Sequence, residues 1–411
     1  MPKNKIMHLC AIAMAGFLLL GRWTLERVGI TSDILNTLPD LRILVLAPVA
    51  LIACYFFGIT KRHPLSPFQV CLYLFLGWAC LSSLWSIQPQ DASAKLIDAL
   101  LVLVFILSFA QFSTHFQAKR FIPLFGKYYL FILAALACWA VASIDFFWEE
   151  LGSAANRKVF AVGSGPNVFG RNMALLSAGL ILLLNNSKKI WVPTILAGVP
   201  AALVLLSGSR GALLEFLAVL LGSMFFLRRS FILRLAIPAL LLVPLGLSTL
   251  KGYETSLLEA ALNIQNQRLV ENTIQTFHDS SRIELWSEAY VLGMEHPIVG
   301  MGLGGYEYLH SEGVTLHYPH NLVAESWSEL GLVGLTLILL LGGCFACAYL
   351  PRLRSTWGFI SAGVITSGIF SMISGDLYDT RTLFCFSLAW ILLYNTPHDE
   401  QDPGTRPSPS A

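Results

Sequence analysis

The sequence predicts an all-α polytopic membrane protein, and three observations favour that fold class: the composition, the length of the apolar runs and the placement of basic residues. Of the 411 residues, 55% are hydrophobic and only 13% are charged, whereas about a quarter are charged in soluble domains. A soluble globule of this size could not bury so much apolar surface. The composition therefore excludes a cytosolic enzyme, a disordered chain and a secreted disulfide scaffold. The net charge of +2 is too small to suggest a nucleic-acid partner.

Apolar runs that are long enough to cross a bilayer as helices, about 20 residues each, divide the chain into about twelve predicted spans. We expect them at residues 6–21, 42–59, 68–86, 96–112, 128–147, 169–185, 191–207, 211–227, 231–247, 321–349, 356–374 and 381–395. Pro238 and Pro244 interrupt the ninth run and make it the weakest. The runs lack the two-residue alternation of a membrane barrel.

Basic residues in the short loops orient these spans. They gather on one side, at Lys61, Arg62, Lys119, Arg120, Lys127, Lys188, Lys189, Arg228, Arg229, Arg234, Arg352 and Arg354. Because cytoplasmic loops are enriched in Lys and Arg, we expect both termini in the cytoplasm.

The same pattern predicts the division of the chain into regions. Residues 1–247 hold spans one to nine, residues 248–320 form one large helical loop on the outer side, and residues 321–395 hold the last three spans. Residues 396–411 are polar and rich in proline, which is typical of a disordered tail. The eight cysteines all fall in apolar runs, which favours packing roles over disulfides or metal ligands.

The large outer loop carries the first candidate site residues. Residues 254–277 predict an amphipathic helix that could lie on the membrane surface or cover a cavity. Ser281 and Glu284 form a capping-box pattern that opens a second helix, ending near Glu295 before Pro297. Arg282 then stands at the first helical position, where free N–H groups already favour an anion such as phosphate. The alternative is a surface arginine in a structural loop.

The end of the same loop carries a candidate base. The glycine-rich run at 300–305 has no preceding strand, so it predicts a flexible or tight outer loop and not a dinucleotide site. His317, His320 and Asn321 follow and lead directly into the tenth span. A neutral imidazole is the usual proton acceptor in group transfer, which makes His320 a candidate base. An interfacial histidine with a structural role is the alternative.

Charges at the outer ends of other spans add further candidates. Arg210 opens the eighth span on the outer side, where a cation needs a partner, either Glu215 one turn deeper or an anionic ligand. Asp376, Asp379 and Arg381 lie between the last two spans, and Asn167 and Arg171 flank the start of the sixth. These groups line the same cavity or are ordinary interfacial groups. The chain has no Asp-x-Asp pair, so a metal–diphosphate site is not supported.

Residues 210–334 resemble the O-antigen ligase and O-antigen polymerase superfamily of bacterial inner-membrane proteins. The resemblance rests on Ser-Arg-Gly at 209–211, on Arg282 with Trp286, Pro297, Gly300, Gly302 and Tyr306, and on His320-Asn321 followed after nine residues by Gly331-Leu332-Val333-Gly334. The last pattern is similar to a motif associated with O-antigen ligases.

The resemblance implies a GT-C-like membrane fold and a metal-independent, inverting glycosyltransferase without a cofactor. It implies transfer of O-antigen from undecaprenyl diphosphate to the lipid A–core oligosaccharide of lipopolysaccharide, at the periplasmic face of the inner membrane. Carried onto this sequence, it makes His320 the catalytic base and makes Arg210 and Arg282 the diphosphate ligands. Asn321, Asp376, Arg381, His317 and Arg171 are expected accessory residues.

Three other functions stay open from the sequence. An O-antigen polymerase would use the same lipid-linked donor with a lipid-linked acceptor. A solute transporter is a rival of another class, although the charges lie at the outer ends of the spans and not at mid-membrane. A scaffold without chemistry is the third alternative.

Overall fold

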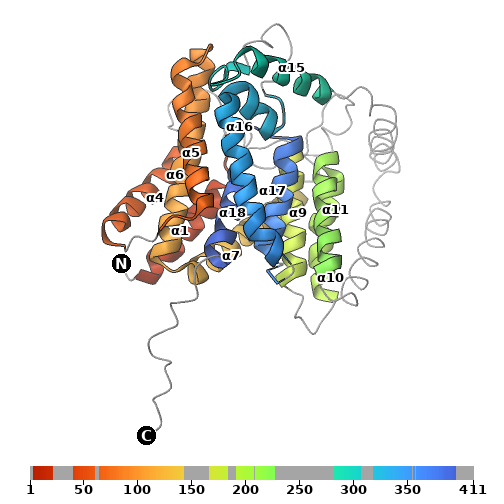
Figure 1. Ribbon diagram of the computed structural model, residues 1–411. Coiled ribbons are helices and arrows are strands. Elements are labelled where there is room, and N and C mark those ends of the chain that lie inside the picture. Colours follow the sequence, from red (N-terminus) through yellow and green to blue (C-terminus); the bar gives the residue numbers. More distant parts are fainter. Residues whose placement is uncertain are drawn as a thin grey trace, which may run out of the picture.

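The structure, a computed structural model, describes residues 3–21, 40–60, 64–142, 166–183, 191–226, 281–306 and 318–394, apart from the single positions 208, 354 and 357. Within these ranges the regular structure is helical (Figure 1). The α-helices are α1 Lys3–Phe17, α4 Leu41–Ile59, α5 Pro67–Ser82, α6 Pro89–His115, α7 Ala118–Ala142, α9 Pro166–Leu183, α10 Trp191–Leu206, α11 Arg210–Phe226, α15 Ser281–Glu295, α16 Leu322–Tyr349, α17 Phe359–Ile373 and α18 Arg381–Tyr394.

The chain is a helical multi-pass membrane protein. Among the described residues, five helical segments are long and apolar enough to cross a membrane, and shorter apolar helices lie within α11, α17 and α18. A helix occupies each predicted span except 231–247, which lies outside the described residues. The predicted helix at 254–277, His317 and the predicted tail at 396–411 also lie outside them. The count of twelve spans stays a prediction.

Two helices begin well before the predicted span edges. The α6 helix starts at Pro89, where proline suits the first helical turn, and α7 starts at Ala118 after a residue with positive φ, Gln117. Phe121 and Phe125 in the early part of α7 are fully buried. Burial of one apolar face thus extends the helix through a stretch that is too polar to be recognised as a membrane span.

The helices pack into a bundle whose core is rich in aromatic side chains. Phe105 and Phe109 of α6 contact each other. Phe105 stacks on Phe17 of α1, and Phe109 packs edge-to-face against Phe125 of α7. On the other side, α9 packs against α10, α11 and α17. The α15 helix lies across one end of the bundle, next to the start of α16 (Figure 1).

The α16 helix is broken at Gly331, which has φ 65° and ψ −162°. The loop at 297–305 fills the break with hydrogen bonds. The amides of Met301 and Gly302 donate to the carbonyls of Ser328 and Glu329 at 3.0 and 2.9 Å. On the far side of the break, the amide of Leu332 donates to the Pro297 carbonyl at 2.8 Å. The break therefore leaves these backbone groups paired instead of buried without partners.

Side chains complete this arrangement. The indole of Trp78 on α5 donates to the Leu330 carbonyl at 3.1 Å. The buried hydroxyl of Tyr306 donates to the Leu285 carbonyl of α15 at 3.2 Å. Of the two forms expected for the loop at 300–305, flexible or tight, the structure has the tight one, and this loop holds the broken helix against α5 and α15.

Gly331→Ala should lower the thermal unfolding midpoint clearly, whereas Gly342→Ala on the same helix should not. A Cβ at Gly331 would lie 2.4 Å from the Gly300 amide nitrogen, and the backbone conformation is open only to glycine, which costs other residues at least about 1–3 kcal/mol. A Cβ at Gly342 meets nothing within 4 Å. Equal midpoints for the two purified variants would contradict the importance of the break.

Candidate functional site

His320 lies directly before α16, at the end of the bundle that α15 covers. Its backbone has a positive φ of 55°, which is uncommon for a residue with a side chain. Its ring contacts the ring of Tyr318, with centroids 4.4 Å apart. The Nδ1 atom is buried and has no hydrogen-bond partner among the residues that the structure describes. The ring therefore has one nitrogen available for a ligand.

Asn321 has a structural task beside it. Its side-chain oxygen caps α16 by accepting hydrogen bonds from the amides of Val323 and Ala324 at 2.9 and 3.0 Å. Its side-chain nitrogen donates to the Met372 carbonyl near the end of α17 at 3.0 Å. The His-Asn pair is thus fixed by a helix cap that also joins α16 to α17.

Arg282 and Asp376 both lie near His320. Arg282 is in the first turn of α15, and one turn later the Trp286 indole donates to the Pro319 carbonyl at 3.0 Å. Burial, followed by the positive charge of Arg282, lowers the pKa of His320 from 6.5 to about 4, and the negative charge of Asp376 opposes this shift. The imidazole is therefore uncharged at neutral pH and lies between an arginine and a carboxylate that are distant in the sequence.

The start of α11, which is Arg210, is tied to the same end of the bundle. Ser209 caps α11, with the Ala212 amide donating to its hydroxyl at 3.1 Å, and the hydroxyl donates to the Asn167 side-chain oxygen at 2.8 Å. The Asn167 amide group donates in turn to the Ser374 hydroxyl at 2.9 Å. This chain of bonds reaches the end of α17, where Met372 meets Asn321. The side chain of Arg210 lies outside the described part of the structure.

Arg171 and Glu215 lie deeper in the bundle, on α9 and α11. Arg171 is 1% exposed and Glu215 is 0% exposed, and none of their charged nitrogen or oxygen atoms makes a hydrogen bond. The Arg171 guanidinium lies over the ring of Phe370 on α17, 4.2 Å from its centroid. The suggested pairing of Glu215 with Arg210 stays a prediction, because the Arg210 side chain lies outside the described part of the structure.

Arg381 has partners that favour a structural role over the expected accessory one. Its guanidinium donates to the carbonyls of Leu18 and Leu20 at 3.0 and 2.8 Å, just beyond the end of α1. It also donates to the Tyr378 carbonyl and lies 3.5 Å from Asp379. These contacts join the end of α1 to the start of α18.

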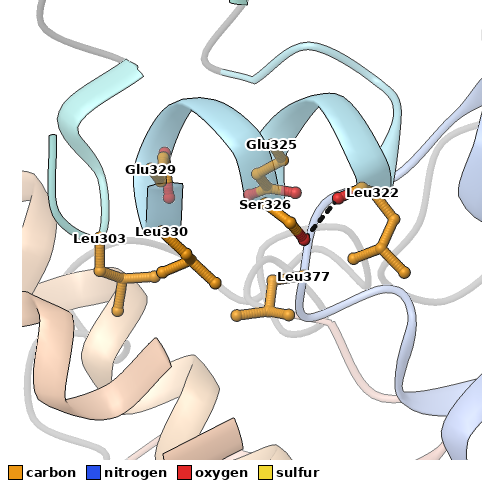
Figure 2. A pocket seen from close by; sticks show the side chains of 7 residues that line it. All are labelled: Leu303, Leu322, Glu325, Ser326, Glu329, Leu330 and Leu377. Carbon is orange, nitrogen blue, oxygen red and sulfur yellow. Dashed lines mark hydrogen bonds between the residues drawn. The ribbon is translucent and has the colours of Figure 1, made fainter. Parts of the chain in front are cut away.

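A buried charged cluster of Lys95, Glu325 and Glu329 was missed from the sequence. The Lys95 Nζ atom on α6 lies 2.6 Å from Glu329 Oε1 and 3.2 Å from Glu325 Oε1 on α16. Two glutamates one helical turn apart inside an apolar run are a signal that could have revealed it, because such residues are rare in membrane spans. A small pocket adjoins the cluster (Figure 2). It is lined by Leu303, Leu322, Glu325, Ser326, Glu329, Leu330 and Leu377.

Comparison with known families gives this geometry a context. Residues 195–339 match the model of a family described as O-antigen ligase. Over this segment, the chain is similar to the O-antigen ligase family. The matched domain runs from α10 into α16 and includes Arg210, Arg282, His320 and Gly331.

Relatives among curated proteins agree with the family. A Rickettsia conorii protein with the provisional name polysaccharide ligase RC0486 is 26% identical over 304 residues, covering 69% of this chain and 67% of the relative. A Rickettsia prowazekii protein with the provisional name polysaccharide ligase RP358 is 26% identical over 345 residues, covering 78% of each chain. An uncharacterised Haemophilus influenzae protein is 30% identical over 194 residues. That alignment covers 44% of this chain and 48% of the relative, so the similarity spans about half of its length.

The depressed pKa of His320 predicts a pH dependence of stability. The native ring stays neutral down to about pH 4, whereas in the unfolded chain it takes up a proton below 6.5. Because the unfolded state binds more protons in this window, the contribution of His320 to stability is full above pH 6.5 and is lost as the pH falls towards 4.

We therefore expect His320→Gln to reduce the rise of the unfolding midpoint between pH 4 and 6.5, measured by a thermal scan at each pH. His296→Gln, at an exposed position, is the matched control and should leave the slope unchanged. If the unfolding midpoint rises equally with pH in the His320→Gln variant and in the native protein, the lowered pKa of His320 is contradicted.

Proposed function

We propose that this protein is an O-antigen ligase, which moves O-antigen from undecaprenyl diphosphate to the lipid A–core oligosaccharide at the periplasmic face of the inner membrane. One observation carries the proposal: an uncharged His320 with a free ring nitrogen lies beside Arg282, at the end of the bundle where the Arg210 helix also starts. Similarity to the O-antigen ligase family over residues 195–339 supports the reaction class, and the geometry supports the roles of the residues.

The leaving group supplies the driving force for transfer. The periplasm contains no ATP, and a lipid diphosphate leaves readily if its negative charge is held. Arg282 at the start of α15 and Arg210 at the start of α11 each add a guanidinium fork to a helix N-terminus, where anions are already favoured. Arg171, whose guanidinium is buried without a hydrogen bond, is a third candidate for an anionic oxygen. Donors placed in this way stabilise a departing charge by about 3–4 kcal/mol each.

His320 acts as the general base. It takes the proton of the acceptor hydroxyl on Nδ1, while the acceptor oxygen bonds to the anomeric carbon and the bond from that carbon to the diphosphate oxygen breaks. The electron pair leaves with the diphosphate, and a single displacement of this kind inverts the anomeric centre. No metal is required when the arginines hold the diphosphate.

The bound donor prepares this base. In the protein alone, the positive charge of Arg282 helps to keep the pKa of His320 low. A diphosphate bound at Arg282 offsets that charge and adds negative charge nearby, which raises the pKa of the imidazole. His320 therefore becomes a stronger base when the leaving group is in place, because a base is most effective with a pKa near the working pH.

His320→Ala should reduce glycan transfer by about 10²–10⁴-fold while leaving donor binding largely intact, because general-base help is worth that much. The assay is reconstitution in liposomes with purified lipid-linked O-antigen and lipid A–core, scored by attachment of glycan to the core. Normal ligation by the His320→Ala protein would show that the base is wrongly assigned. A native protein that only lengthens the lipid-linked glycan is a polymerase, and one that moves solute without glycosyl transfer is a transporter.

Arg210→Ala, Arg282→Ala and Arg171→Met should each weaken binding of the lipid diphosphate donor, measured by titration of the protein in nanodiscs. Lysine at position 210 or 282 should restore binding only in part, since the bidentate fork is lost. Arg120→Ala, at an exposed site on α7, is the control and should bind normally. Full rescue by lysine at both sites would indicate generic charge in place of bidentate recognition.

A further inference from the structure

The first part of α16, residues 322–330, is a short arm that carries the site residues at its start. Asn321 caps the arm and His320 precedes it. Because the helix is broken at Gly331, the direction of the arm is not set by the longer part of α16 that follows. Contacts of the arm itself must hold it in place.

Lys95 on α6 makes the salt bridges that hold the arm. Its ammonium group bonds to Glu329 at 2.6 Å and to Glu325 at 3.2 Å, and all three side chains are at most 7% exposed. The second oxygen of Glu329 accepts a hydrogen bond from the Gly304 amide at 3.0 Å. The second oxygen of Glu325 has no partner and adjoins the pocket shown in Figure 2.

The balance of charge makes Lys95 indispensable to this arrangement. A single ammonium faces two buried carboxylates, and the charge of Asp376 acts on both Lys95 and Glu325. Removing one partner of a buried ion pair is strongly destabilising, because the remaining charge is left without compensation. Without Lys95, the Glu329 carboxylate would lose its buried counter-charge, and the arm would lose its bonds to α6.

Such a movement would reach the site by two routes. The arm carries Asn321, which bonds to the Met372 carbonyl, and it follows His320 directly. The α17 helix leads in turn to Asp376, whose charge acts on both His320 and Lys95. Arg282 lies on a different helix, α15, so a shift of the arm would change the position of His320 relative to the arginine.

We propose that Lys95 is a positioning residue for glycosyl transfer: it holds the two glutamates of the arm and so fixes His320 against Arg282. The inference rests on the proposed function of His320. Lys95 does not contact the substrate, since it is buried and bonded to both glutamates.

The test compares Lys95→Met with Arg42→Met. Arg42 is a second buried cation, bonded to Asp40 and to Asp98 of the same α6 helix, and it serves as the matched control for loss of a buried ion pair. We expect Lys95→Met to lower kcat by about 100-fold, the effect of a misplaced catalytic group, with the KM for the lipid-linked donor nearly unchanged. Arg42→Met should lose stability but keep kcat. An unchanged kcat in Lys95→Met, or an equal loss in Arg42→Met, would overturn the proposal.

A charge-neutral variant distinguishes a positioning role of Lys95 from direct contact of Lys95 with the substrate. It also tests the proposal if Lys95→Met does not fold. In Lys95→Met with Glu325→Gln and Glu329→Gln, no charge remains in the cluster, so no buried carboxylate is left without a counter-charge. Positioning predicts that this triple variant recovers kcat at least about 10-fold over Lys95→Met, within the range expected for reorientation. A triple variant that folds but shows no recovery would overturn the proposal.

Hydrogen exchange measured by mass spectrometry gives a readout that does not depend on activity. In Lys95→Met, the peptide covering 318–330 should exchange faster, whereas the peptide covering α5 at 67–82 should not change. Unchanged exchange in 318–330 would overturn the inference even if the protein is a ligase. If the native protein transfers no glycan but the 318–330 peptide exchanges faster in Lys95→Met, the proposed function is overturned. The same result would support the conclusion that Lys95 holds the arm in place.

Discussion

The break of α16 at Gly331 is the constraint on which the candidate site depends. An unbroken helix would carry His320 and Asn321 along a single axis with the membrane-spanning part. The positive φ of Gly331 gives residues 322–330 a direction of their own, and the loop at 297–305 pairs the backbone groups that the break would otherwise leave unbonded. The family pattern includes Gly300, Gly302 and Tyr306. These residues therefore support the geometry of the broken helix and do not take part in the chemistry directly.

Charges buried in an apolar bundle are costly, so their positions are informative. The Lys95 cluster is satisfied by mutual pairing, and Arg381 by the carbonyls beyond α1. Arg171 and Glu215 lack any hydrogen bond although both are fully buried. A buried guanidinium of this kind is retained at a cost in stability, and an anionic group of a substrate would offset that cost. The hydrogen bonds of Arg381 indicate a role in the fold, whereas the unbonded guanidinium of Arg171 is suited to an anionic ligand.

The electrostatics at His320 couple its basicity to the donor. Arg282 suppresses protonation of the ring in the protein alone, which keeps Nδ1 free to accept a proton. In the proposed function, the same arginine holds the diphosphate. Arg282 would then act on the leaving group directly and on the base, His320, through its charge. Donor binding would come first and proton transfer second.

The sequence by itself determined the membrane class, the positions of most helices, the start of α15 near Arg282 and the proximity of His320 to a helix start. Each of these depends on composition or on neighbours within a turn or two of the chain. Only the tertiary structure decided that Lys95 meets Glu325, 230 residues away, that Gly331 interrupts α16, and that Arg171 and Glu215 remain unbonded. These features depend on which distant segments pack together. Two glutamates in an apolar run indicate a buried partner, but no local signal identifies that partner as Lys95 or places a break at Gly331.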